Sequence, residues 1–268
     1  MCGVTPATAN ELTLAPAHMG RLAELSLRGL QHAQALQLPS LGERAERLYA
    51  WNRLPSSAWR RVAAEADRIT AKVTLAAGTT WIQTDAGPPT SHWCRWRPIA
   101  APTMRRDRVW KVYISPHPQD LADNICIALS ACEGLPILSL KYGADEYGML
   151  RPDKLVVHLA TRDSVDVLGG RLLLMLGGCP VHGVPFTAEL GGDGLVSWGC
   201  DPPAGSAVAR VTPSWRSWVT QELARGLACG SAFGIEPWQH ALQAIALAGV
   251  DPVTWAPSPD LWATSDPG

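Results

Sequence analysis

Several features of other protein classes are missing from this sequence. No run of about 18 apolar residues occurs, so no segment is expected to span a bilayer. Residues 1–20 contain no basic stretch followed by an apolar core, so no signal peptide is expected either. The formal net charge is −1 over 268 residues, which excludes a global attraction to nucleic acid or to an anionic membrane.

The motifs of metal, nucleotide and hydrolase sites are also missing. None of the seven cysteines forms a CxxC pair, so we expect reduced thiols in a reducing, cytoplasmic compartment. The glycine pairs of the chain do not fit GxGxxG or a Walker loop, and neither GxSxG nor HExxH occurs. His117, His182 and Asp201 lack the spacing of a metal site. The sequence therefore predicts no cofactor and no metal.

Lysine is scarce. Only four of the 23 lysine and arginine residues are lysines, and Lys111, Lys141 and Lys154 fall within 44 residues of each other. A desolvated lysine can lose its proton and act as a base, whereas arginine does so with great difficulty. Two explanations stay open at this point: chance with codon bias, or a chemical use for these lysines.

The first hundred residues are expected to be mainly helical. Apolar residues recur at helical spacing from Gly20 onward, and amphipathic stretches follow at 43–54 and 57–76. A segment rich in glycine, proline and threonine at 78–90 predicts a loop and a candidate domain boundary. We therefore divide the chain into a helical region, 1–100, and a second domain, 101–268.

The second part of the chain alternates between strand and helix patterns. Strands are predicted at 109–115, 136–142, 154–160, 184–188 and 195–198, with a turn at 143–148. Helices are predicted at 119–132, 163–176, 214–229 and 237–248. This order indicates an α+β fold in which helices pack on a mixed sheet.

Three of the predicted strands carry polar side chains that are expected to share one surface. Lys111 and Tyr113 are two residues apart on a strand, so both leave the same face. The complete set consists of Lys111, Tyr113, Lys141, Arg151, Lys154 and His158. Arginine grips a phosphate with two parallel hydrogen bonds and lysine adds a point charge, so this set suits an anion. Charged strand ends are, however, also common as solvated sheet edges.

Tryptophan is abundant, with twelve residues against two phenylalanines. Trp215 and Trp218 lie three apart on a predicted helix, and we expect them to pack in the core. Trp93 and Trp96 fall in the predicted loop and could line a peptide groove, because tryptophan often anchors interfaces.

The segments WKVYISPHPQDL (110–121) and SLKYGADEYGMLRPDKLVVHLA (139–160) resemble the type III effector family known as HopA. Homologues of that family occur beside biosynthetic clusters for lanthipeptide-type and thioamide-type peptides. The blocks HGVPFTAEL (182–190), SWGCDPP (197–203), SWRSWV (214–219) and GVDPVTW (249–255) resemble those biosynthetic relatives. The likeness covers about residues 105 to 256.

This resemblance implies a lyase. In those clusters a kinase-like phosphotransferase would phosphorylate serine or threonine of a precursor peptide. The HopA-like protein would then eliminate phosphate to leave dehydroalanine or dehydrobutyrine. The family is compared with phosphothreonine lyases, whose strand carries a base and an acid as Lys-x-His. Here Lys111 fits the base, while Tyr113 occupies the place of that histidine.

Several assignments follow from the resemblance and remain alternatives. Tyr113 or His158 would protonate the leaving phosphate, or a phosphate held by cations would leave unaided. Lys141, Arg151 and Lys154 would hold the phosphate. Two other readings stay open: a non-catalytic partner that presents the precursor peptide to a kinase-like enzyme, and an effector that acts on a host protein.

Overall fold

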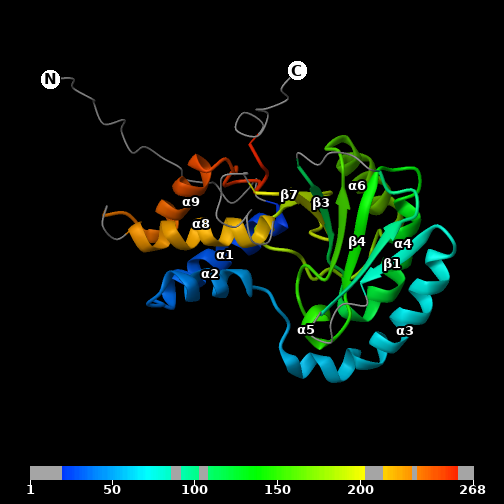
Figure 1. Ribbon diagram of the computed structural model, residues 1–268. Helices are drawn as coiled ribbons and strands as arrows, with labels where there is room; N and C mark the ends of the chain where they lie inside the picture. The colour runs from blue at the N-terminus through cyan, green and yellow to red at the C-terminus, as the bar shows by residue number, and fades with distance from the viewer. Residues whose placement is uncertain (1–19, 86–91, 103–107, 203–213, 231–233, 259–268) are drawn as a thin grey trace, which may run out of the picture.

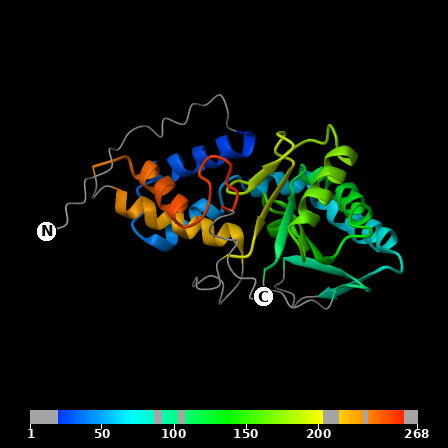
Figure 2. The ribbon, with the colours of Figure 1, turned by 90° about the horizontal axis from the view of Figure 1, so that it is seen from above.

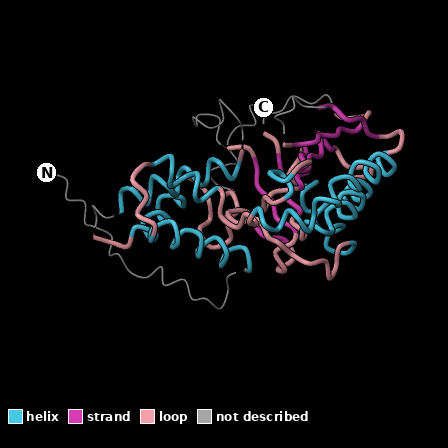
Figure 3. The backbone as a smooth tube through the Cα atoms, turned by 90° about the horizontal axis from the view of Figure 1, so that it is seen from below, coloured by secondary structure: helices cyan, strands magenta, loops and turns pink. Residues whose placement is uncertain are grey.

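The computed structural model describes residues 20–85, 92–102, 108–202, 214–230 and 234–258. These residues form a helical lobe beside a lobe built on a sheet (Figure 1). The helical lobe holds α1 (Arg21–Ala35), α2 (Leu41–Tyr49), α8 (Trp215–Gly230) and α9 (Pro237–Leu247). The separation of the two lobes is also plain from above and from below (Figures 2 and 3).

The sheet lobe contains one seven-stranded sheet with the order β1-β2-β4-β5-β3-β7-β6. Every pairing in it between described residues is antiparallel. Its strands are β1 (Trp81–Asp85), β2 (Trp93–Pro98), β3 (Trp110–Ile114), β4 (Ile137–Gly143), β5 (Leu155–Leu159), β6 (Ala188–Leu190) and β7 (Val196–Cys200). Its helices are α3 (Trp59–Ala77), α4 (Leu121–Ala131), α5 (Glu146–Met149) and α6 (Asp163–Met175). The predicted α+β class is confirmed, and the sheet that was expected to be mixed is antiparallel throughout the described residues.

One face of the sheet carries the main core. Side chains alternate between the two faces of a strand, so Val112 and Ile114 of β3 leave one face while Lys111 and Tyr113 leave the other. Val112 and Ile114 pack into an apolar core that α3, α4 and α6 share with the strands. Lys111 and Tyr113 are also buried, although they lie on the opposite face. The second face is therefore covered as well, and it holds polar groups.

The helical lobe combines helices from the start of the described chain, α1 and α2, with helices from its end, α8 and α9. Apolar side chains of α1, α2, α8 and α9 form a second core, which includes Trp215 and Trp218. The prediction that these two tryptophans are core residues is confirmed, because they are 0% and 3% exposed. Helix α2 begins with a capping box, in which Ser40 and Glu43 bond each other's backbone N–H groups.

Three local predictions are corrected by the structure. The segment predicted as a loop at 78–90 contains strand β1, and Trp96 lies in β2 with its side chain in the sheet core. The predicted turn at 143–148 leads into the short helix α5, since the Asp145 carboxylate accepts the N–H of Gly148. The strand expected at 184–188 is β6, at Ala188–Leu190.

The helical expectation for the first hundred residues is confirmed for α1, α2 and α3. The two strands that follow belong to the same sheet as the rest of the chain, and α1 and α2 pack with α8 and α9. The division into separate domains at residue 100 stays a prediction. Among the described residues, no helix is both long and apolar enough to cross a lipid bilayer.

Candidate functional site

The polar face of the sheet is organised in two rows that run across the strands. In an antiparallel sheet, residues directly opposite each other on neighbouring strands point to the same face. One row consists of Ser139, His158, Lys111 and Gly199, on β4, β5, β3 and β7. The next row consists of Arg95, Lys141, Val156, Tyr113 and Ser197, on β2, β4, β5, β3 and β7. Cationic side chains of three strands thus share one face.

The helical lobe covers one end of this face. Gly199 of β7 has no side chain, and a Cβ atom built there would lie 2.7 Å from the indole ring of Trp215. The absence of a side chain at Gly199 lets α8 approach the sheet beside Lys111. The polar groups on β3 and β7 are therefore buried beneath the helical lobe, whereas Arg95 on β2 is exposed.

Lys111 is held by a carboxylate. Its side chain is 6% exposed, and its Nζ atom lies 2.5 Å from Oδ1 of Asp201. Asp201 directly follows β7, where its N–H donates to the carbonyl oxygen of Val109 and extends the pairing with β3. The Asp201 carboxylate therefore already occupies one side of the Lys111 amine.

Lys141 has different surroundings. Its Nζ atom lies 4.4 Å from the ring centroid of Trp93, and no ion pair with a carboxylate is found for it among the described residues. Burial lowers the pKa of Lys141 to about 8, and the nearby Lys111, Arg151 and Arg95 act in the same direction against Asp153. A lysine in this state has an appreciable neutral fraction near neutral pH and can accept a proton.

Arg151 lies beside Lys141 at the centre of an ion-pair network. Its guanidinium carbon is 5.2 Å from the centroid of the same Trp93 ring. Its Nε and NH2 groups each donate to one carboxylate oxygen of Asp153 at 2.9 Å, and NH2 also donates to the hydroxyl of Tyr49 at 2.5 Å. Arg216 of α8 pairs with the same carboxylate at 3.0 Å.

The network connects the two lobes. Burial alone would raise the pKa of Asp153, but the guanidinium groups of Arg216 and Arg151 hold it well below its usual value. Arg216 also donates to the carbonyl oxygen of Tyr49 at 3.0 Å. Tyr49 ends α2 and Arg216 lies in α8. The Asp153 carboxylate therefore holds the helical lobe against the turn that precedes β5.

His158 and Tyr113 lie on the polar face as expected, and both are neutral groups. Burial lowers the pKa of His158 well below its usual value, and Lys141, Lys111 and Arg95 lower it further. Its Nδ1 atom lies 3.2 Å from the hydroxyl of Ser139. Burial raises the pKa of Tyr113 well above its usual value, so the phenol keeps its proton.

Lys154 does not join the other predicted residues. Its side chain has no exposure, and its Nζ atom lies 3.0 Å from the Pro116 carbonyl oxygen and 2.6 Å from Nδ1 of His182. Burial lowers its pKa to about 7. The proposed phosphate contact of Lys154 is replaced by internal hydrogen bonds in this structure.

The structure adds residues that sequence reasoning missed. Arg95 and Ser139 enter through strand register, which the sequence does not specify. Asp201 enters because β7 extends to Cys200, two residues beyond the predicted strand. Tyr49 and Arg216 come from distant helices and gave no signal. Among the described residues, no three histidine, cysteine or acidic side chains gather as metal ligands would.

The fold is shared with solved effector proteins. An effector protein from Pseudomonas syringae pv. syringae strain 61 matches with a TM-score of 0.58 and 14% identity, over 89% of this chain and 99% of that chain. The effector protein from Pseudomonas syringae pv. tomato strain DC3000 matches with a TM-score of 0.55 and 13% identity, over 88% and 98%. These TM-scores establish a common fold, in agreement with the resemblance to an effector family.

A third solved structure, with a lower TM-score, is named as a lyase. The type III effector/phosphothreonine lyase OspF from Shigella flexneri matches with a TM-score of 0.35 and 12% identity, over 55% of this chain and 84% of that chain. No protein-family model matches the sequence, and no curated protein matches it.

Proposed function

We propose that this protein eliminates phosphate from phosphoserine or phosphothreonine of a ribosomal precursor peptide, which leaves dehydroalanine or dehydrobutyrine. The observation that carries the proposal is the environment of Lys141. This lysine has a pKa lowered to about 8, and it lies on the same face as a second lysine and beside a buried arginine. Such a site combines a base with the positive charge that a phosphate dianion requires.

The residues of the cluster divide into a base and an anion site. Lys111 was expected to be the base, but it is paired with Asp201, whereas Lys141 has aromatic and cationic neighbours. We therefore assign the base to Lys141. Lys111 and Arg151 would stabilise the phosphate through their positive charge.

The reaction needs one proton to move. Neutral Lys141 takes the proton from the α-carbon of the phosphorylated residue, and the electron pair of that C–H bond forms the Cα=Cβ double bond. The Cβ–O bond breaks, and its electron pair leaves with the phosphate. The proton then passes from Lys141 to the departing oxygen, so inorganic phosphate leaves as the monohydrogen dianion and Lys141 becomes neutral again. Tyr113, whose phenol keeps its proton, is the alternative proton donor.

The substrate must be supplied by a phosphate-transferring enzyme. A kinase-like phosphotransferase that acts on the precursor peptide would be the partner. The alternative function is a non-catalytic partner that presents the peptide to such an enzyme, since the same cations would bind a phosphorylated peptide without reacting.

Mass spectrometry of a phosphoserine or phosphothreonine peptide after incubation with the protein tests the proposal. Elimination lowers the peptide mass by about 98 Da, the mass of phosphoric acid. Lys141→Arg keeps the charge and is expected to abolish this loss, while Lys111→Arg should retain part of it. Lys72→Met is the control, because Lys72 pairs with Asp123 between α3 and α4. These helices cover the face of the sheet opposite the polar cluster.

The result separates the candidate functions. Peptide binding with no change of mass would support the non-catalytic partner. Full elimination by Lys141→Arg together with its loss in Lys111→Arg would return the base role to Lys111.

A further inference from the structure

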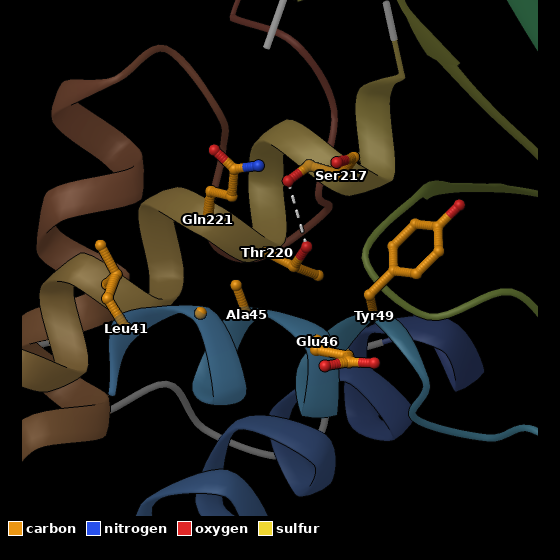
Figure 4. Close-up of a pocket in the computed structure, with 8 residues that line it drawn as sticks. Leu41, Ala45, Glu46, Tyr49, Ser217, Thr220 and Gln221 are labelled. Atoms are coloured by element: carbon orange, nitrogen blue, oxygen red, sulfur yellow. Dashed lines mark hydrogen bonds between the residues drawn. The ribbon is translucent and has the colours of Figure 1, made fainter. Parts of the chain in front are cut away.

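A groove of about 430 Å³ lies between α2 and α8 in the helical lobe. Leu41, Gly42, Ala45, Glu46 and Tyr49 of α2 line one side, and Ser217, Thr220 and Gln221 of α8 line the other. Figure 4 shows the two helices side by side, with Leu41 near one end of the groove and Tyr49 near the other. None of the residues that line this groove was assigned above to the base or to the phosphate contacts.

The two walls differ in chemistry. The α2 wall is mainly apolar, because Leu41, Gly42 and Ala45 contribute no polar side chain. The α8 wall is polar and ends in the amide of Gln221 (Figure 4). Glu46 is the single carboxylate among the lining residues, it is exposed, and no ion pair is found for it within the described residues. An apolar wall, a polar wall and an unpaired carboxylate suit a peptide that carries a basic side chain.

The groove adjoins the ion-pair network of the candidate active site. Tyr49 lines the groove, and its hydroxyl accepts a hydrogen bond from Arg151 at 2.5 Å. Arg216 precedes the lining residue Ser217 in α8 and pairs with Asp153, the same carboxylate that holds Arg151. Tyr49 therefore lies between the groove and Arg151, so a peptide bound at the anion site would also be close to the groove.

The length of the groove fits a short stretch of peptide. Leu41 and Tyr49 are eight residues apart on a helix, which corresponds to about 12 Å at about 1.5 Å per residue. An extended chain advances about 3.3 Å per residue, so about four residues cover this length.

We infer that the groove between α2 and α8 binds an extended segment of the substrate peptide adjacent to the phosphorylated residue, with a lysine or arginine of that segment at Glu46. This inference rests on the proposed function for the identity of the peptide, and it adds the recognition of its flanking sequence. The groove thereby selects precursor peptides by their charge and positions the phosphorylated residue at Lys141.

The decisive variant is Gly42→Trp. A Cβ atom built on Gly42 meets nothing within 4 Å, so a large side chain has room to enter the groove without displacing the protein interior. Gly42→Ala is the control for the change of backbone, since alanine favours a helix more than glycine does. Gly170→Trp is the control for an added surface tryptophan, because Gly170 is also open and lies in α6 of the other lobe.

The readout is the Kd of fluorescent phosphopeptides. One peptide carries only the phosphorylated residue and its neighbours, and two others add a lysine-containing arm on the N-terminal or the C-terminal side. Gly42→Trp should weaken one armed peptide by about tenfold relative to Gly42→Ala and leave the short peptide unchanged, while Gly170→Trp binds all peptides normally. Glu46→Lys should reverse the preference, favouring an arm with glutamate in place of lysine.

Each other outcome has a definite meaning. Equal affinities of Gly42→Trp and the unmodified protein for all three peptides would overturn the inference. The inference also fails if Gly42→Trp changes the oligomeric state in size-exclusion chromatography without altering peptide affinity, because the groove would then hold a second copy of the chain. Normal groove-dependent binding without any loss of phosphate would leave the inference intact and refute the lyase.

Discussion

Nζ of Lys111 lies 2.5 Å from Oδ1 of Asp201, so the lysine at the centre of the polar face already has an anion beside it. A substrate phosphate that binds Lys111 must compete with this carboxylate. We predict that Asp201→Asn, which removes the negative charge and keeps the shape, tightens the binding of inorganic phosphate severalfold. Isothermal titration calorimetry measures this effect.

The control for this prediction is Asp123→Asn. It removes the carboxylate that pairs with Lys72 at a more exposed position away from the cluster. Phosphate affinity should not change in that variant. Weaker phosphate binding by Asp201→Asn would mean that Asp201 positions Lys111 for the anion and does not compete with it.

The lowered pKa of Lys141 predicts a pH profile for elimination. The reactive form is the neutral amine, whose fraction rises with pH until the pKa of about 8 is passed. The kcat/KM for phosphate release should therefore increase about tenfold per pH unit below that value and level off above it. A profile that stays flat from pH 6 to 9 would contradict the assignment of the base to Lys141.

His158 offers a test of the acid in the reaction. Because burial and the nearby lysines keep its ring neutral, it is not an imidazolium that could protonate the leaving phosphate near neutral pH. We expect His158→Gln to keep elimination within severalfold of the unmodified protein. A loss of about 100-fold or more, the usual effect of removing a general acid, would restore the acid role to His158.

Lys154 makes a separate prediction about stability. Its folded-state pKa of about 7 lies below the unfolded value of about 10.4, so between these pH values the unfolded chain binds one more proton. The contribution of Lys154 to the free energy of unfolding therefore rises with pH through this window and is least favourable below pH 7. Lys154→Met should flatten the pH dependence, as measured by urea unfolding from pH 6 to 10.

An unfolding profile of Lys154→Met as steep as that of the unmodified protein would contradict the assigned pKa. Lys72→Met is the control here too, because its ion pair with Asp123 is partly exposed to solvent.

The sequence predicted the sheet and its lysines better than it predicted the site. Alternation of apolar and polar residues is a local signal, and it placed Lys111 and Tyr113 on one face correctly. Strand order is not local, so the shared surface of Lys111 and His158 was predicted, but the position of β5 between β4 and β3 was not. Periodicity also does not reveal whether a lysine is paired, and only the fold distinguishes Lys111 from Lys141.

The contribution of α2 and α8 to the site could not be predicted from the sequence either, because it also depends on long-range packing. Tyr49 and Arg216 are 167 residues apart, and each carries an ordinary helical pattern. Their contact depends on the packing of α2 against α8, which follows from the apolar faces of both helices. The site therefore includes residues that no motif near the lysines could indicate.

The buried carboxylate of Asp153 connects the two lobes, and its removal is expected to destabilise the protein. Its side chain is 9% exposed and pairs with both Arg151 and Arg216. Asp153→Asn would leave two guanidinium groups facing each other without a counter-charge, and breaking a buried ion pair by removing one partner costs about 3–5 kcal/mol. We therefore expect the free energy of unfolding to fall by about 3 kcal/mol or more in urea titrations.

An exposed ion pair gives the matched control. Asp166 pairs with Arg162 one helical turn away in α6, and its side chain is 62% exposed. Because solvent screens such pairs, Asp166→Asn should cost no more than about 0.5 kcal/mol. Equal losses in the two variants would mean that Asp153 does not hold the lobes together. A loss of stability confined to Asp153→Asn, accompanied by weaker phosphate binding, would show that this carboxylate supports both the fold and the anion site.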